Sequence, residues 1–82
     1  MERSEIEARV RKVVARVLGV EENRVGPDSR FVEDLGAESV QGLELVASFE
    51  EEFGIEMEEN AALEVKSVGK AVDFIAKYLI PE

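Results

Sequence analysis

A chain of 82 residues has room for one domain, spanning residues 1–82, with a single modest core. It contains no cysteine and no histidine, which excludes disulfides and thiolate metal sites and removes the most common general base, so we expect that it is not an enzyme. Its formal net charge of −9 disfavours contact with nucleic acid and with anionic membranes.

The first predicted helix begins at Ser4 and ends at Gly19. Ser4 and Glu7 have the spacing of a capping box, and glycine is a common stop signal at the C-terminal end of a helix. Apolar residues recur within it at helical spacing, at Ile6, Val10, Val13, Val14 and Val17. Because most of them are β-branched, we expect this helix to depend on tertiary packing.

A long connection follows, over residues 20–38. The sequence at residues 26–29, Gly-Pro-Asp-Ser, predicts a turn, and Val25, Phe31 and Leu35 are expected to anchor the connection to the core. A loop of this length is uncommon in a small domain unless it is functional.

The second predicted helix covers residues 39–53 and ends at Gly54. Its inward stripe is expected to be Leu43, Val46, Phe49 and Phe53, widened by Leu45.

Residues 58–63 favour one short helix, and Ser67 is expected to cap a final helix that ends just before Pro81. The inner face of this last helix is predicted to be Val68, Ala71, Val72, Ile75, Tyr78 and Leu79. The sequence therefore predicts an all-α fold, a small four-helix bundle with three principal helices, one short helix and a long first loop.

Charge is distributed unevenly along the chain. No lysine or arginine occurs in residues 31–65, which hold eleven acidic residues, so this stretch carries −11 and the remainder, with ten bases and eight acids, carries +2. A charge run alone usually indicates a solvated surface. Here it surrounds Ser39, which favours a surface that attracts basic patches on partner proteins.

Ser39 lies where the long connection becomes the second helix. Taken alone, a serine there is typical of a helix N-cap, but Gly42 three residues later gives no capping box, and Gly36 and Ala37 leave the hydroxyl approachable. A phosphodiester at this position would meet the positive end of the helix dipole. Neither a nucleophile elbow nor an EF-hand loop is present, and we expect no specific metal site. The pattern favours a serine that is modified by another protein.

The run from Phe31 to Val40, Phe-Val-Glu-Asp-Leu-Gly-Ala-Glu-Ser-Val, resembles the motif of acyl carrier proteins, usually written around Asp-Ser-Leu. The similarity continues through Leu45-Val46 and residues 50–53 to residues 72–75, so it covers nearly the whole chain. The resemblance implies that Ser39 carries a 4′-phosphopantetheine arm, which a phosphopantetheinyl transferase takes from coenzyme A. The arm would hold acyl groups as thioesters and present them to acyl-synthesising and acyl-transferring enzymes.

The resemblance also implies roles for other residues. Those expected to meet basic docking patches of partner enzymes are Glu38, Val40, Glu44, Ala47, Glu50 and Glu51. Those expected to line a cavity that shelters the acyl chain are Gly42, Leu45, Val46, Phe49, Phe53 and Ile75. For each residue the simpler alternative, a solvated or a core side chain, stays open. We expect a cytoplasmic monomer without membrane insertion, because the apolar runs are short and no signal peptide is recognisable.

Four residues at the motif depart from the family pattern. Glu38 replaces an aspartate, Val40 a leucine and Gln41 a common acid, while Gly42 lies within a helix, where glycine costs about 0.5–1 kcal/mol relative to alanine. Gly42 indicates either close packing of a neighbouring element or extra room beside Ser39. The expected function is a carrier in fatty acid or related lipid biosynthesis. The alternatives are a carrier for polyketide or other secondary metabolism, or an unmodified acidic interaction module with the same fold.

Overall fold

The computed structural model describes residues 1–79. In chain order, it contains α1 (Arg3–Leu18), a 3-10 turn η1 (Glu22–Arg24), α2 (Gln41–Phe53), α3 (Glu59–Leu63) and α4 (Val68–Leu79). The prediction of an all-α fold with three principal helices and one short helix is confirmed. None of the helices in this described part of the chain combines the length and the apolar character needed to cross a membrane.

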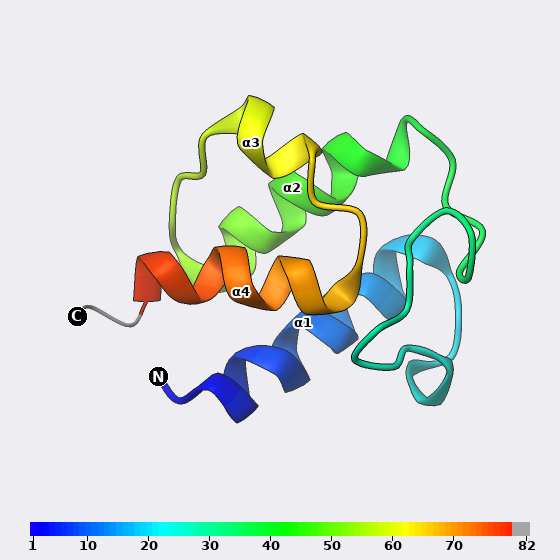
Figure 1. The fold of residues 1–82 in the computed structure, drawn as a ribbon, viewed down its shortest axis with the longest axis horizontal. Coiled ribbons are helices and arrows are strands. Elements are labelled where there is room, and N and C mark those ends of the chain that lie inside the picture. Colours follow the sequence, from blue (N-terminus) through cyan, green and yellow to red (C-terminus); the bar gives the residue numbers. More distant parts are fainter. Residues whose placement is uncertain (80–82) are drawn as a thin grey trace.

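Helix α1 packs against both α2 and α4, while α3 lies against α2 (Figure 1). Helices α1 and α4 run in opposite directions, and an ion pair between Arg3 and Asp73 joins the start of α1 to α4. The connection between α1 and α2 lies at the end of the molecule opposite the N-terminus (Figure 1). Helix α2 begins at that same end, and this is where the segment containing Ser39 lies.

The core consists mainly of branched aliphatic side chains from α1 and α4. The fully or almost fully buried side chains of these two helices are Ile6, Val10, Val13, Val14, Val68, Ala71, Val72 and Ile75. Helix α2 adds Leu45, Phe49 and Phe53, and α3 adds Ala62. The β-branched face of α1 is therefore held by tertiary burial, as its low helix propensity led us to expect.

The observed start of α1 differs from the prediction, and its observed end agrees with it. The helix begins earlier than predicted, because the carbonyl oxygen of Glu2 already accepts hydrogen bonds from the amides of Glu5 and Ile6, each at 3.1 Å. Ser4 thus lies within the first turn, and the predicted capping box of Ser4 and Glu7 is wrong. The predicted stop at Gly19 is confirmed, since this residue adopts φ 69° and its amide donates to the carbonyl of Ala15.

Two residues that we predicted to face inward are exposed. Leu43 is 53% exposed, since the inner face of α2 repeats every four residues from Leu45 and a position two residues earlier lies on the other side of the helix. Tyr78 is 43% exposed. Its hydroxyl accepts a hydrogen bond from the amide of Glu58, 3.3 Å away, and so ties α4 to the start of α3. The prediction for Pro81 lies outside the described residues.

The two later helices begin close to the predicted positions. The carboxylate of Glu58 accepts hydrogen bonds from the amides of Asn60 and Ala61, which starts α3. The hydroxyl of Ser67 accepts one from the amide of Lys70 at 3.3 Å, which confirms Ser67 as the cap of α4.

The long connection is fastened to the core at the predicted positions, because Val25, Phe31 and Leu35 are all buried. The turn at residues 26–29 is also confirmed, by a hydrogen bond of 3.2 Å from the amide of Ser29 to the carbonyl of Gly26. Arg11 of α1 adds a further tie, since its Nε donates to the carbonyl of Val25 at 2.8 Å. The loop that leads to Ser39 is therefore fixed along its length.

Candidate functional site

Ser39 is exposed and lies in a tight turn that leads into α2. The amide of Gln41 donates to the carbonyl of Glu38 at 2.9 Å, and the amide of Gly42 donates to the carbonyl of Ser39 at 3.3 Å. Val40 occupies the N-cap position, and no side chain caps the helix there. Interpreting Ser39 as an N-cap is therefore wrong. The Ser39 hydroxyl makes no hydrogen bond within residues 1–79, so it has no structural role there.

The segment before Ser39 is held by an ordered turn. The amide of Ala37 donates to the carbonyl of Phe31 at 2.8 Å, and the Ala37 side chain is buried. Gly36 adopts φ 72°, a conformation that side chains other than glycine rarely take. A Cβ atom added at Gly36 would meet nothing within 4 Å, so the backbone conformation, and not a lack of space, requires the glycine there.

The same turn is fastened at its start by Arg30 and Asp34. The carboxylate of Asp34 accepts from the backbone amide of Arg30 at 2.8 Å and from its guanidinium at 3.1 and 3.3 Å. The hydrogen bond from the Arg30 side chain, with that from its backbone, lowers the pKa of Asp34, and the same contact raises the pKa of Arg30. Both side chains are exposed, so this pair orders the loop without a buried charge.

Gln41, which departs from the motif described above, has two hydrogen-bond partners. Its Oε1 accepts from the amide of Glu38 at 2.8 Å, which is the backward-reaching half of a capping box. Its Nε2 donates to the carbonyl of Val17 in α1 at 3.4 Å. The carboxylate of Glu38 stays exposed beside Ser39.

A groove of about 240 Å³ opens directly beside Ser39. It is lined by Phe31, Val32, Ala37, Glu38, Ser39, Gly42, Leu45, Leu63, Val65 and Lys66. Five of these residues, Phe31, Gly42, Leu45, Leu63 and Val65, also line a second space deeper in the bundle. The two spaces therefore share one wall, and Ser39 lies on its outer side.

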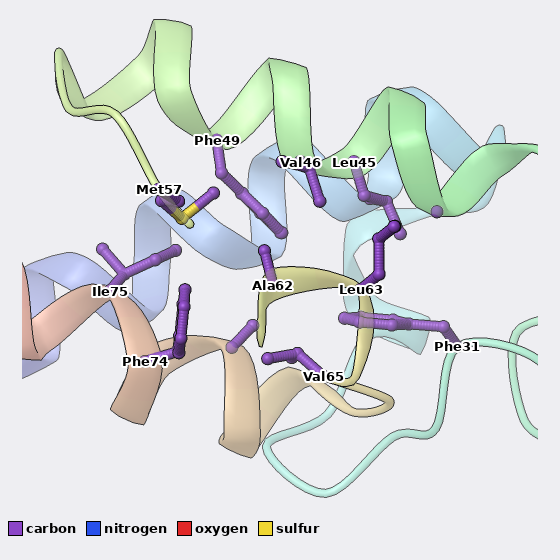
Figure 2. Close-up of a pocket in the computed structure, with 12 residues that line it drawn as sticks. Phe31, Leu45, Val46, Phe49, Met57, Ala62, Leu63, Val65, Phe74 and Ile75 are labelled. Atoms are coloured by element: carbon purple, nitrogen blue, oxygen red, sulfur yellow. The ribbon is translucent and has the colours of Figure 1, made fainter. Parts of the chain in front are cut away.

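The deeper space is an apolar cavity of about 40 Å³ between α2, α3 and α4. Figure 2 shows Leu45, Val46 and Phe49 reaching into it from α2, opposite Phe74 and Ile75 of α4. Such a volume holds about one water-sized group, so an acyl chain would have to push the walls apart.

Five of the six residues predicted to shelter an acyl chain line this cavity, namely Gly42, Leu45, Val46, Phe49 and Ile75. Phe53 does not, because it lies under Arg9, whose guanidinium carbon is 5.6 Å from the ring centroid. The remaining lining residues were not predicted to be part of this cavity: Phe31, Met57, Ala62, Leu63, Val65, Ala71 and Phe74. Four of them, Met57, Ala62, Leu63 and Val65, lie in or beside the short helix α3.

Gly42 contributes to both the groove and the cavity. A Cβ atom added there would lie 3.6 Å from the Cδ2 atom of Leu63, which is an ordinary van der Waals contact. Close packing therefore does not require a glycine at this position. Gly69 provides the contrast, because a Cβ there would lie only 2.9 Å from the carbonyl oxygen of Pro27.

The predicted docking residues do not all have the same surroundings. Glu38, Val40, Glu44, Ala47 and Glu51 are exposed, and Val40 is 63% exposed. Glu50 is half-buried, and its carboxylate accepts from the amide of Met57 at 2.8 Å. Leu43, which we had predicted to face inward, instead joins this surface. The outer side of α2 thus combines carboxylates with exposed apolar side chains.

We find no metal centre in residues 1–79, since no three acidic side chains gather closely enough there to hold an ion. Comparison with known protein families found a match. A family model described as a phosphopantetheine attachment site covers residues 8–75 of the chain.

Proposed function

Because this chain belongs to the phosphopantetheine attachment site family, we propose that it is an acyl carrier protein whose arm is attached at Ser39. Members of this family hold 4′-phosphopantetheine covalently. The observation that carries the assignment to Ser39 is its exposed hydroxyl, which lacks a hydrogen bond within the described residues and borders an open groove. An anchored loop before it and a helix after it would present that hydroxyl at a fixed position.

The chain itself would supply the acceptor and its setting. In the loading step, Ser39 Oγ forms a bond to the β-phosphorus of coenzyme A, the bond to the leaving 3′,5′-adenosine diphosphate breaks, and the hydroxyl proton passes to a base. We assign that base to the transferase, because this sequence has no histidine, the side chain that most often acts as a general base. The bound arm supplies the thiol that the sequence lacks. We therefore regard the protein as a carrier that has no turnover of its own.

The apolar cavity supports an aliphatic cargo. Every residue that lines it is apolar or glycine, so it would favour methylene groups over polar substituents. Burial contributes roughly 0.8 kcal/mol per methylene, so six methylenes could offset about 5 kcal/mol of opening cost. The shared wall between groove and cavity, which includes Leu63 and Val65, is the part that would have to move. These features favour fatty acid or related lipid biosynthesis over pathways with polar intermediates.

The outer side of α2 would bind the partner enzymes. Glu44, Ala47 and Glu51 recur at helical spacing on it, and the exposed Val40 and Leu43 add apolar contact area. Exposed ion pairs contribute only about 0.2–1 kcal/mol each, which suits a carrier that must leave each enzyme quickly. Partners with basic patches, the transferase among them, are the expected ligands of this surface, and we propose that the carrier meets them as a cytoplasmic monomer.

The test is the intact mass of the protein after incubation with coenzyme A and a broad-specificity phosphopantetheinyl transferase. We expect a gain of one phosphopantetheine in the wild type and in a Ser48→Ala control, and none in Ser39→Ala. A gain in Ser39→Ala would contradict the site. No gain in the wild type with any transferase would favour the unmodified interaction module.

Fatty and polar cargoes can then be compared on the loaded protein. Thioesters of saturated chains should raise the melting temperature as the chain lengthens, because more methylenes are buried. A polyketide-type chain with several oxygens should raise it less. The reverse order would favour the carrier of secondary metabolism.

A further inference from the structure

The groove beside Ser39 contains one basic residue, Lys66, and one acidic residue, Glu38. Lys66 is the first lysine or arginine after the 35 residues from Phe31 to Val65, which carry none. A basic side chain at this place is therefore unusual within the charge pattern of the chain.

The backbone of Lys66 is coupled directly to the loop that carries Ser39. Phe31 joins the two segments, because its amide donates to the carbonyl of Lys66 at 2.9 Å while its own carbonyl accepts from the amide of Ala37 at 2.8 Å. Ala37 is two residues from Ser39. The next residue after Lys66, Ser67, also pairs with Arg30 in an isolated antiparallel bridge. These contacts keep Lys66 and Ser39 on the two sides of one groove.

The side chain of Lys66 is exposed, and within residues 1–79 it makes no ion pair and no hydrogen bond. A phosphodiester on Ser39 would add one negative charge next to Glu38, in a stretch that already carries eleven acids. Repulsion would disfavour that charge unless a cation lies close to it. Among residues 1–79, Lys66 is the one cation that lines the groove.

We propose that Lys66 binds the phosphodiester of the arm and directs the first part of the arm along the groove. This inference rests on the proposed attachment at Ser39. The ammonium group would pair with a non-bridging phosphate oxygen, as lysine does with phosphates elsewhere. Such a contact would offset the repulsion from Glu38 and would hold the arm over Leu63 and Val65, at the wall of the cavity. No bond is made or broken in this role.

Lys70 provides a matched control. It lines a shallow hollow on the α4 side together with Lys66 and Lys77, but it does not line the groove that contains Ser39. Lys66→Ala and Lys70→Ala therefore remove the same charge from neighbouring surface positions, and only the first removes it from the groove. Lys66→Arg keeps the charge.

The experiment compares the melting temperatures of the unloaded and loaded forms of each protein at low salt, with complete loading verified by intact mass. Loading should lower the melting temperature of Lys66→Ala by about 2–5 °C more than that of the wild type. Lys70→Ala and Lys66→Arg should behave like the wild type. This difference should shrink in about 0.5 M salt, because the contact is exposed. In the wild type, the NMR signals of the Lys66 ε-methylene should shift on loading, and those of Lys70 should not.

The experiment distinguishes a failure of the attachment at Ser39 from a failure of the role of Lys66. If the wild type gains no mass, the attachment at Ser39 and the role of Lys66 are both overturned. If all proteins load but Lys66→Ala and Lys70→Ala change equally on loading, and the Lys66 signals do not move, the role of Lys66 is overturned while the carrier function stands.

Discussion

The side-chain amide of Gln41 donates a hydrogen bond to the carbonyl oxygen of Val17 and so joins the first turn of α2 to the last turn of α1. The other end of the same amide accepts from the backbone of Glu38. One uncharged side chain thus holds both the helix start and the residue before Ser39. An acid at this position could accept from Glu38, but it would have no proton to donate to Val17.

We expect Gln41→Ala to lower the free energy of unfolding by about 1 kcal/mol, because two partly exposed hydrogen bonds are lost. The amide proton of Glu38 should also exchange faster with solvent, which NMR can measure. Gln41→Glu keeps the acceptor and loses the donor, so it should fall between the wild type and Gln41→Ala. Unchanged exchange at Glu38 in Gln41→Ala would show that the backbone turn holds this segment without the side chain.

Gly42→Ala should separate stability from cargo binding. A methyl group at this position meets Leu63 at an ordinary distance, and alanine favours a helix over glycine by about 0.5–1 kcal/mol, so the unloaded variant should be more stable than the wild type. The same methyl group narrows the groove and the cavity. The stabilisation that a long acyl chain gives to the loaded protein should therefore be smaller in the variant. Both effects can be read from melting temperatures of the unloaded and acylated forms.

Gly69→Ala is the control for this experiment, because its new methyl group would meet the backbone oxygen of Pro27 at 2.9 Å. We expect it to destabilise the protein by about 1–3 kcal/mol. If unloaded Gly42→Ala were destabilised as much as Gly69→Ala, then packing would require Gly42, and the glycine would not serve to leave room beside Ser39.

The fold could be predicted largely from the sequence because the elements have strong local signals. Gly19 and Gly54 both take the left-handed conformation that ends a helix, and the spacing of Val10, Val13 and Val14 requires a buried helical face. The errors arose where several local patterns fit. Ser4 satisfies a capping rule, yet the turn begins at Glu2, and Leu43 fits a spacing of three residues although the observed face repeats every four.

The site was only partly predictable, for a different reason. Ser39 and the acids around it follow from a contiguous motif, so the chain itself brings them together. The walls of the groove and the cavity come from residues far apart in the sequence, such as Phe31 and Val65. These two become neighbours because the amide of Phe31 donates to the carbonyl of Lys66, a contact that no local pattern predicts. The structural role of Glu50 could not be predicted either, because its hydrogen-bond partner is the backbone amide of Met57 in the following loop.

The ion pair of Arg30 and Asp34 should give the loop a pH dependence. The folded protein has a lowered pKa at Asp34, so the pair stabilises the fold above the ordinary carboxyl range and loses this contribution as the pH falls through the lowered value. Asp34→Asn should therefore be less stable than the wild type at pH 7, and the difference should close well below about pH 4. Chemical unfolding at several pH values measures it.

Glu33→Gln is the matched control, since Glu33 meets Arg30 only at 3.7 Å and makes no hydrogen bond to its backbone amide. It should change stability at pH 7 less than Asp34→Asn does. A gap between the wild type and Asp34→Asn that stayed constant down to strong acid would show that the carboxylate charge does not contribute to holding this turn.

Docking through α2 can be tested with substitutions that leave the fold intact. Suitable acids are those that are exposed and make no structural hydrogen bond. Glu44 and Glu51 are exposed, whereas Glu50 bonds to Met57, so its replacement would confound docking with unfolding. We expect Glu44→Lys with Glu51→Lys to slow association with the transferase roughly tenfold at low salt and less at high salt, because charge steering is screened. Stopped-flow binding provides the rates.

The control carries the same change in net charge elsewhere. Glu21 and Glu22 are exposed and precede or begin η1, which packs against α1, so Glu21→Lys with Glu22→Lys should slow association much less. Equal slowing in both double variants would mean that overall charge, rather than the surface of α2, attracts the transferase. An effect confined to the α2 variant would place the docking surface beside Ser39, where the carboxylates and the exposed Val40 and Leu43 can contact the enzyme that approaches the hydroxyl.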